Sequence, residues 1–148
     1  MITGQYYEEF NVGDKFITPR KTIKESAITV MLSLGGLRNP VFVDEEYAKT
    51  TVFGGCVTPG ELTVVFMGGL NEQLDMWWDT VLVGVDKMKF KSPLMAGDTI
   101  YNEIEIIDKK ETSKTNWGIV VDKSVCKNQK GEVVAELDFT HLVPRKSK

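Results

Sequence analysis

The sequence predicts an α+β domain in which an antiparallel sheet wraps around one central helix. Three observations indicate this fold class. Four long segments rich in Val, Ile, Thr and aromatic residues fill the C-terminal half, turn-forming residues separate them, and one strongly apolar helix precedes them. Because a helix that is apolar on nearly every side has to be enclosed, we expect the twisted sheet to curve around it. This arrangement is the hot-dog architecture.

The four predicted strands largely alternate apolar and polar residues, as strands with one buried face do. Polar stretches bearing Gly or Asn separate the second strand from the third and the third from the fourth, so we expect these strands to be neighbours in the sheet. Residues 13–23, near the start of the chain, can supply a fifth strand. The four long strands are predicted at residues 79–93, 97–111, 115–129 and 132–144.

A short helix is predicted at Glu25–Leu34, because Ile28, Met31 and Leu32 fall on one face of such a helix. A longer, central helix is predicted from about residue 59 to about residue 74.

The start of the central helix has the sequence of a capping box. Thr58 is expected at the N-cap, Pro59 at the first helical position, and Glu61 three residues after the threonine. Gly68 and Gly69 later in the helix are expected to let a strand approach closely, because glycine has no Cβ atom.

The composition limits the classes of function. A chain of 148 residues is the length of one domain, so residues 1–148 are expected to form a single unit. The formal charge of -3 does not favour nucleic acid or an anionic membrane as a partner. No signal peptide and no membrane-spanning segment is recognisable, so we expect a cytoplasmic protein. Two isolated cysteines and a single histidine do not match a metal site, so no metal is expected.

Residues 34–47, LGGLRNPVFVDEEY, are arranged like a catalytic loop but have no proton-transferring group in the middle. Asn39, Pro40 and Asp44 form a polar frame. Leu37 and Phe42 occupy the positions where an acid or a base would be most useful.

Four stretches of the sequence together resemble the MaoC-like hydratase and dehydratase family, which includes the R-specific enoyl-CoA hydratases. They are YYEEFNVGDKF, RNPVFVDEEYAKTTVFGG, PGELT and FKSPLMAGDTI, in this order and at this spacing. The resemblance implies a hot-dog fold that pairs as a dimer. It also implies that an acyl-CoA thioester binds along the dimer groove as substrate or ligand, with its acyl tail beside the central helix, and that no other cofactor is needed.

In that family the loop usually reads Ser-Gly-Asp-x-Asn-Pro-x-His-x-Asp, and its first Asp and its His activate water. In this sequence Leu37 falls at the Asp and Phe42 at the His. General acids and bases each contribute roughly 10²- to 10⁴-fold to a rate, and neither Leu nor Phe can move a proton. Ordinary hydration is therefore expected to be severely impaired. Asn39 and Pro40 match the family and are expected to shape a substrate-binding turn, whereas Asp44 is expected to cap the helix that follows.

Glu61 is the one carboxylate that could replace the missing pair, because some hot-dog thioesterases place their catalytic carboxylate on the central helix. The competing interpretation is that Glu61 only completes the capping box. The backbone N–H groups at this helix start could bind a thioester carbonyl oxygen. The residues expected to line this substrate site are Gly55, Cys56, Thr58 and Gly60.

Several other residues allow a functional and a structural interpretation. Cys56 is a nucleophile activated by the helix start or an ordinary free thiol. His141 is expected to be a packing residue of the last strand rather than a base. Trp77 and Trp78 line a pocket or seal the end of the core. The lysines that could meet CoA phosphates or form a solvated strand face are Lys87, Lys89 and Lys91.

The sequence thus supports more than one class of function. The first is an enzyme of the hydratase or dehydratase type that uses substitute groups, or a thioesterase that uses Glu61. The second is a non-catalytic protein that binds a ligand or partners a subunit that retains the Asp and the His. A third is a rearrangement or cyclisation in which an apolar pocket orients the substrate without proton transfer.

Overall fold

The long C-terminal strands form one antiparallel sheet in the computed structural model, which describes residues 4–113 and 116–146. The strand order is β1-β4-β5-β6-β3, so β3 lies at one edge. The pairing of β4 with β5 and of β5 with β6 confirms the predicted neighbours, although residues 114–115 of the first predicted turn lie outside the described residues. The long strands are β3 (Val81–Phe90), β4 (Thr99–Glu111), β5 (Trp117–Lys127) and β6 (Val133–Pro144).

The expected fifth strand is two short strands instead of one. β1 (Lys15–Ile17) and β2 (Lys21–Thr22) both pair antiparallel with β4. Pro19 lies between them, and a proline has no N–H group to donate to a neighbouring strand. The chain therefore leaves the sheet briefly and returns to it.

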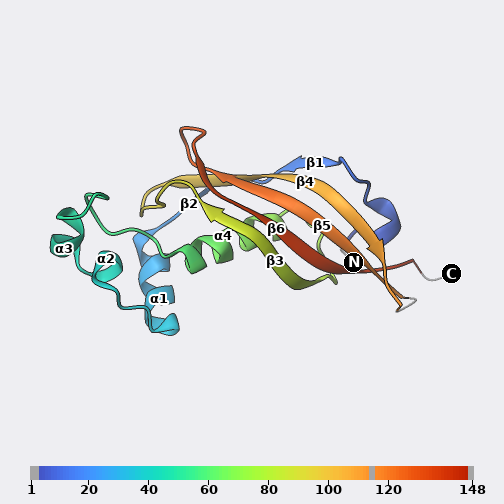
Figure 1. Ribbon diagram of the computed structural model, residues 1–148, viewed down its shortest axis with the longest axis horizontal. Helices are drawn as coiled ribbons and strands as arrows, with labels where there is room; N and C mark the ends of the chain where they lie inside the picture. Colours follow the sequence, from blue (N-terminus) through green and yellow to red (C-terminus); the bar gives the residue numbers. More distant parts are fainter. Residues whose placement is uncertain (1–3, 114–115, 147–148) are drawn as a thin grey trace.

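The helix α4 (Gly60–Glu72) lies along the concave side of the curved sheet, as the hot-dog architecture requires (Figure 1). Its buried side chains include Leu62, Phe66, Met67 and Leu70. These residues form one hydrophobic cluster with inward-facing residues of the strands, and Ile28 and Leu32 of α1 belong to the same cluster. The predicted antiparallel sheet around a central helix is confirmed.

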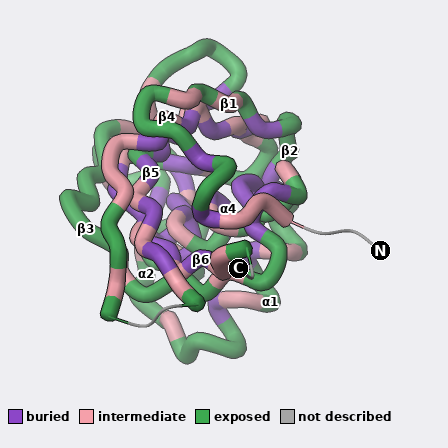
Figure 2. The backbone as a smooth tube through the Cα atoms, turned by 90° about the vertical axis from the view of Figure 1, so that its right-hand side faces the viewer, coloured by how far each residue is buried: buried purple, intermediate pink, exposed green. Residues whose placement is uncertain are grey.

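One face of α4 is open, so the expectation that the whole helix is enclosed is wrong for the described part of this chain. Val65 is 55% exposed, and Gly69 and Glu72 are exposed on the same side. A Cβ atom added to Gly68 or Gly69 would meet nothing within 4 Å, so these glycines do not serve the close approach of a strand within the described residues. Figure 2 shows that the neighbouring edge strand β3 is also exposed.

A chain of buried polar side chains crosses the inner face of the sheet beneath α4. Asn102 on β4 donates to Asn71 of α4 at 2.6 Å, and Asn71 donates to Ser124 on β5 at 2.9 Å. Ser124 donates to Asp122 at 2.8 Å, and the other oxygen of Asp122 lies 2.9 Å from Nε2 of His141 on β6. We call these five residues the polar chain.

The polar chain lies between two hydrophobic clusters. The larger cluster contains most of the buried residues of α4. The smaller cluster includes Tyr7 and Phe10 near the start of the chain, together with Trp77 after α4. Asn102 also donates to the carbonyl oxygen of Met67 at 2.8 Å, so α4 is hydrogen-bonded to the sheet at two of its residues. A helix held this way has a fixed rotation and a fixed position along the strands, because a shifted helix would leave buried polar groups unpaired.

Three helices lie together beyond one end of the sheet (Figure 1). They are α1 (Glu25–Gly35), α2 (Pro40–Val43) and α3 (Glu45–Lys49). Ile28 and Leu32 of α1 are buried and Met31 is half-buried against the core, as the predicted apolar face requires. The short helix η1 (Tyr7–Glu9) precedes the first strand. Within the described ranges, no helix combines the length and apolar character that crossing a bilayer would require.

Candidate functional site

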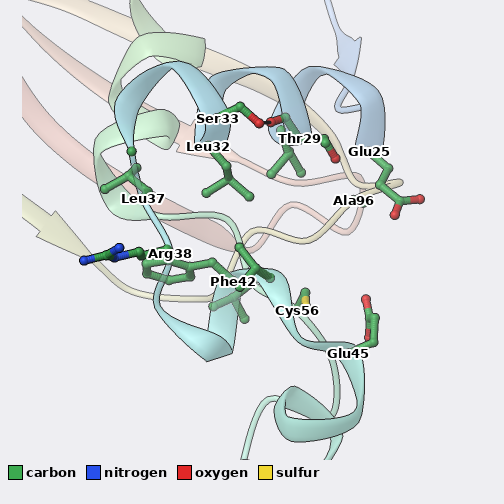
Figure 3. Close-up of a pocket in the computed structure, with 14 residues that line it drawn as sticks. Glu25, Thr29, Leu32, Ser33, Leu37, Arg38, Phe42, Glu45, Cys56 and Ala96 are labelled. Atoms are coloured by element: carbon green, nitrogen blue, oxygen red, sulfur yellow. Dashed lines mark hydrogen bonds between the residues drawn. The ribbon is translucent and has the colours of Figure 1, made fainter.

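A cleft of about 620 Å³ lies between the three end helices and the segment that leads into α4. We call it the loop cleft. Residues of α1 form one wall, α2 and the first residue of α3 form another, and Cys56, Val57 and Ala96 complete it (Figure 3). Because its walls come from four separate stretches of the chain, the folded protein is needed to form it.

Leu37 and Phe42, the two apolar residues at the positions of the expected acid and base, both line the loop cleft. Both also pack against the large hydrophobic cluster beneath α4. The floor of the cleft is therefore continuous with the hydrophobic core. Neither side chain has a group that can hold a water molecule by a hydrogen bond.

The polar frame of the loop shapes its backbone. Asn39 caps α2 by accepting a hydrogen bond from the Val41 amide at 3.3 Å, and Pro40 is the first residue of that helix. Asp44 caps α3 by accepting from the Tyr47 amide at 3.0 Å, as predicted. Asn39 and Pro40 do not line the loop cleft, so their expected role in substrate binding stays a prediction.

The ends of the loop cleft carry opposite charges. Figure 3 shows Glu25 and Glu45 at one end and Arg38 at the other. Cys56 lies next to Glu45. Burial of the thiol raises the pKa of Cys56, and the nearby Glu45 carboxylate raises it further. A raised thiol pKa means that Cys56 is protonated at neutral pH, which contradicts the interpretation of Cys56 as a nucleophile activated by the helix start.

A second cleft, of about 490 Å³, lies at the start of α4, and we call it the helix-start cleft. It brings together Thr58 and Gly60, two of the residues expected at the substrate site, and Glu61, the candidate catalytic carboxylate. Val57 lines both clefts. Its amide donates to the Val41 carbonyl at 3.2 Å, so the wall between the two clefts is attached to α2.

The predicted capping box at the start of α4 is wrong. The N-cap is Pro59, one residue after the expected Thr58, and no side chain caps the helix there. The amide of Thr58 donates instead to the carbonyl of Leu94 at 2.7 Å, so it is not available to Glu61. The Thr58 hydroxyl is buried and has no hydrogen-bond partner among the described residues. Glu61 is exposed, and its carboxylate is free of the structural role that the sequence suggested.

The glycines near the helix start have packing roles. A Cβ atom on Gly60 would lie 2.6 Å from the Phe90 ring, so a larger residue there would displace this exposed ring. A Cβ atom on Gly55 would lie 3.1 Å from the Met95 methyl group. Gly55 is buried and lines neither cleft, so its expected contact with substrate stays a prediction.

The other candidates separate into packing and surface residues. His141 is buried and stacks on Trp77 with ring centroids 4.1 Å apart, so it packs in the strand as expected. Trp77 seals the smaller cluster, whereas Trp78 is exposed. Lys87 pairs with Asp138 at 3.0 Å, and among the three strand lysines only Lys91 lines the helix-start cleft.

Glu25 and Glu45 are site residues that the sequence analysis missed. Glu45 is the first residue after the Asp44 cap, and Glu25 is the first residue of α1, so the start of each helix was the available signal. Their meeting in one cleft depends on the tertiary fold. In the part of the chain that the structure describes, no group of three or more His, Cys, Asp or Glu side chains is placed to hold a metal ion.

Comparisons with known proteins identify the family of the chain. Residues 10–137 match the family described as "FAS1-like, dehydratase domain region". The chain belongs to this MaoC-like dehydratase family. It is 30% identical over 139 residues to the (R)-specific enoyl-CoA hydratase of Rhodospirillum rubrum, an alignment that covers 94% of this chain and 92% of that protein.

Two solved structures share the MaoC-like fold closely. The MaoC-like dehydratase from Rhodospirillum rubrum superposes with a TM-score of 0.85 at 26% identity, covering 98% of this chain and 100% of the other. A protein of Archaeoglobus fulgius, named monoamine oxidase regulatory protein, gives a TM-score of 0.89 at 26% identity, with 97% of each chain covered. The family resemblance and the hot-dog fold predicted from the sequence are both confirmed.

The corrected helix start gives a prediction about stability. Glu61→Ala is expected to change the free energy of unfolding by less than about 0.5 kcal/mol, because an exposed side chain with no cap bond is removed. The matched variant Asp44→Ala removes a true cap and is expected to cost about 1 kcal/mol. Urea unfolding followed by fluorescence measures both values. A loss of stability in Glu61→Ala as large as that in Asp44→Ala would restore the capping interpretation.

Proposed function

We propose that this MaoC-like chain binds an acyl-CoA-like thioester in the loop cleft and does not hydrate it by the ordinary mechanism of the family. The observation that carries the proposal is that Leu37 and Phe42 line the cleft and pack onto the core. The resemblance assigns these two positions to the acid and the base. An apolar floor favours acyl carbons, because removing apolar surface from water contributes about 25 cal/mol per Å².

The positive charge at one end of the loop cleft suits the CoA part of such a ligand. Arg38 is exposed at one end, where a guanidinium can form paired hydrogen bonds with a phosphate of CoA. Gly60 and Glu61, the first residues of α4, line the helix-start cleft, which shares Val57 with the loop cleft. Unpaired N–H groups at a helix start are suited to a thioester carbonyl oxygen. The ligand would then extend across the wall that the two clefts share.

A thioesterase is the second candidate, because Glu61 lines the helix-start cleft and makes no capping hydrogen bond. A carboxylate beside a bound thioester carbonyl can activate water for attack on that carbon. This reaction releases free CoA and leaves the acyl chain otherwise unchanged. The released thiol distinguishes it from hydration, which leaves the thioester intact.

The exposed strand β3 supports pairing with a second subunit. This strand lies at the edge of the sheet, and six of its ten residues are exposed apolar side chains. An exposed apolar edge strand is a surface that proteins normally pair or cover. The partner in this proposal is a second copy of the chain, or a related subunit that retains the Asp and the His. The exposed apolar residues of β3 are Val81, Leu82, Val83, Val85, Met88 and Phe90.

The hydration test compares the unmodified chain with the variant Leu37→Asp plus Phe42→His. The unmodified chain is expected to give no detectable hydration of crotonyl-CoA or of longer enoyl-CoAs, while still binding them in calorimetry. The double variant is expected to gain measurable hydration, because it supplies both proton-transferring groups. The control is Glu61→Gln, which is expected to hydrate no better than the unmodified chain.

The same assay, with a thiol reagent present, reports thioester hydrolysis. Release of CoA that Glu61→Gln abolishes would establish the thioesterase in place of the binding protein. Robust hydration by the unmodified chain would contradict the proposal directly.

Pairing through β3 is tested by measuring the molar mass of the purified protein in solution. Light scattering on the purified chain is expected to give twice the 16.6 kDa of one subunit. Val83→Lys plus Val85→Lys, which places charges in the middle of the edge strand, is expected to give a monomer. The matched control is Val12→Lys plus Ile17→Lys, which changes two other exposed apolar residues and is expected to keep the dimer. A monomeric unmodified chain at micromolar concentration would exclude the homodimer.

A further inference from the structure

A small cavity of about 70 Å³ lies near the C-terminal end of α4, away from both clefts. It lies between the helix and the strands β3 and β6, and none of its lining residues belongs to the loop cleft or to the helix-start cleft. A volume of this size is comparable to that of two water molecules in the liquid, at about 30 Å³ each. The residues that give it its chemistry are Gly68, Asn71, Trp77, Thr80, Leu82 and His141.

His141 presents one free ring nitrogen in this cavity wall. Its Nε2 atom is paired with Asp122, and both oxygens of that carboxylate are engaged, one with His141 and one with the Ser124 hydroxyl. With Asp122 as the acceptor of this pair, as it is for Ser124, Nε2 carries the shared proton. Among the hydrogen bonds of the described residues, none involves Nδ1. Asp122 therefore fixes the direction of the ring, and Nδ1 is the atom left to meet a ligand.

A second unpartnered group lies in the same wall. Trp77 is only 6% exposed, and its Nε1–H has no hydrogen-bond partner within the described ranges. A buried donor without a partner costs about 1–3 kcal/mol, so such groups normally mark a missing water or ligand. Trp77 stacks on His141 and also lines the cavity, so the buried indole holds the imidazole ring in place beside it.

We propose that this cavity binds a hydroxyl group. A hydroxyl both donates and accepts, so it can pair with Nδ1 of His141 in either protonation state of the ring. A methyl group of similar size would leave Nδ1 unpaired. The small volume of the cavity favours the end of a straight chain over a ring.

The hydroxyl can come from two sources. One source is the far end of an acyl chain, and this version rests on the proposed thioester-binding function. Gly60 and Gly68 are eight residues apart on α4, which corresponds to about 12 Å along the helix. An acyl chain whose first carbons lie on the apolar floor of the loop cleft, and whose later carbons follow α4 past Val65, would bring its far end to the cavity. The other source is a small free alcohol.

The test uses the fact that His141 is the only histidine in the sequence, so its ring signals in nitrogen-15 NMR spectra are unambiguous. ω-Hydroxydecanoyl-CoA is expected to shift the Nδ1 resonance of His141, whereas decanoyl-CoA is not. The hydroxylated thioester is also expected to bind about fivefold more tightly, the factor that one net hydrogen bond supplies. A parallel titration with 1-propanol examines the free alcohol.

A matched pair of glycine variants tests the position of the site. Replacing His141 would leave Asp122 buried without its partner and endanger folding, so the cavity is filled instead. Gly68→Leu places a side chain at the cavity, and Gly69→Leu places the same side chain on the adjacent residue, which does not line it. Neither position has an atom within 4 Å of an added Cβ. Gly68→Leu is expected to abolish the fivefold preference, and Gly69→Leu is expected to keep it.

The outcomes separate this inference from the proposed function. Equal affinity for the two thioesters, with Nδ1 unchanged by either of them and by 1-propanol, would overturn the hydroxyl site and leave thioester binding intact. A shift of Nδ1 by 1-propanol, in a chain that binds no CoA thioester, would support the hydroxyl site and remove the proposed function. Retention of the preference in Gly68→Leu would place the hydroxyl elsewhere and contradict the inference.

Discussion

The contact of Leu37 and Phe42 with the hydrophobic core is the constraint on which the character of the loop cleft depends. These two side chains line a cleft and also pack against the cluster beneath α4. Both side chains are half-buried, with one side on the core and the other on the cleft. The positions that the resemblance assigns to the acid and the base therefore present apolar side chains to the cleft.

The polar chain gives that surface its position. Asn71 and the Met67 carbonyl hold α4 against β4 and β5, and the start of the same helix borders the helix-start cleft. A helix held only by apolar contacts could slide or rotate, since dispersion contacts are not directional. The hydrogen bonds remove this freedom, and they fix the position at which the start of α4 borders the helix-start cleft.

Much of the fold could be predicted from the sequence, because strand alternation and helical periodicity are local signals. The long strands, the apolar face of α1 and the Asp44 cap all follow from residues close together in the chain. The capping box could not be judged this way, because the Thr58 amide is bonded to Leu94, which is far away in the sequence. The pairing of Asp122 with His141 likewise depends on the register of β5 with β6. The meeting of Glu25 and Glu45 in one cleft requires the whole arrangement of the end helices.

The central claim, that the loop cleft holds a thioester without holding a reactive water, is tested most directly by a crystal structure of the chain with bound decanoyl-CoA. The account predicts that the acyl carbons next to the thioester contact Leu37 and Phe42, and that no ordered water lies within hydrogen-bonding distance of a protein base beside them. An ordered water held by Glu45 or Glu61 next to those carbons would contradict the account. So would a thioester bound outside both clefts.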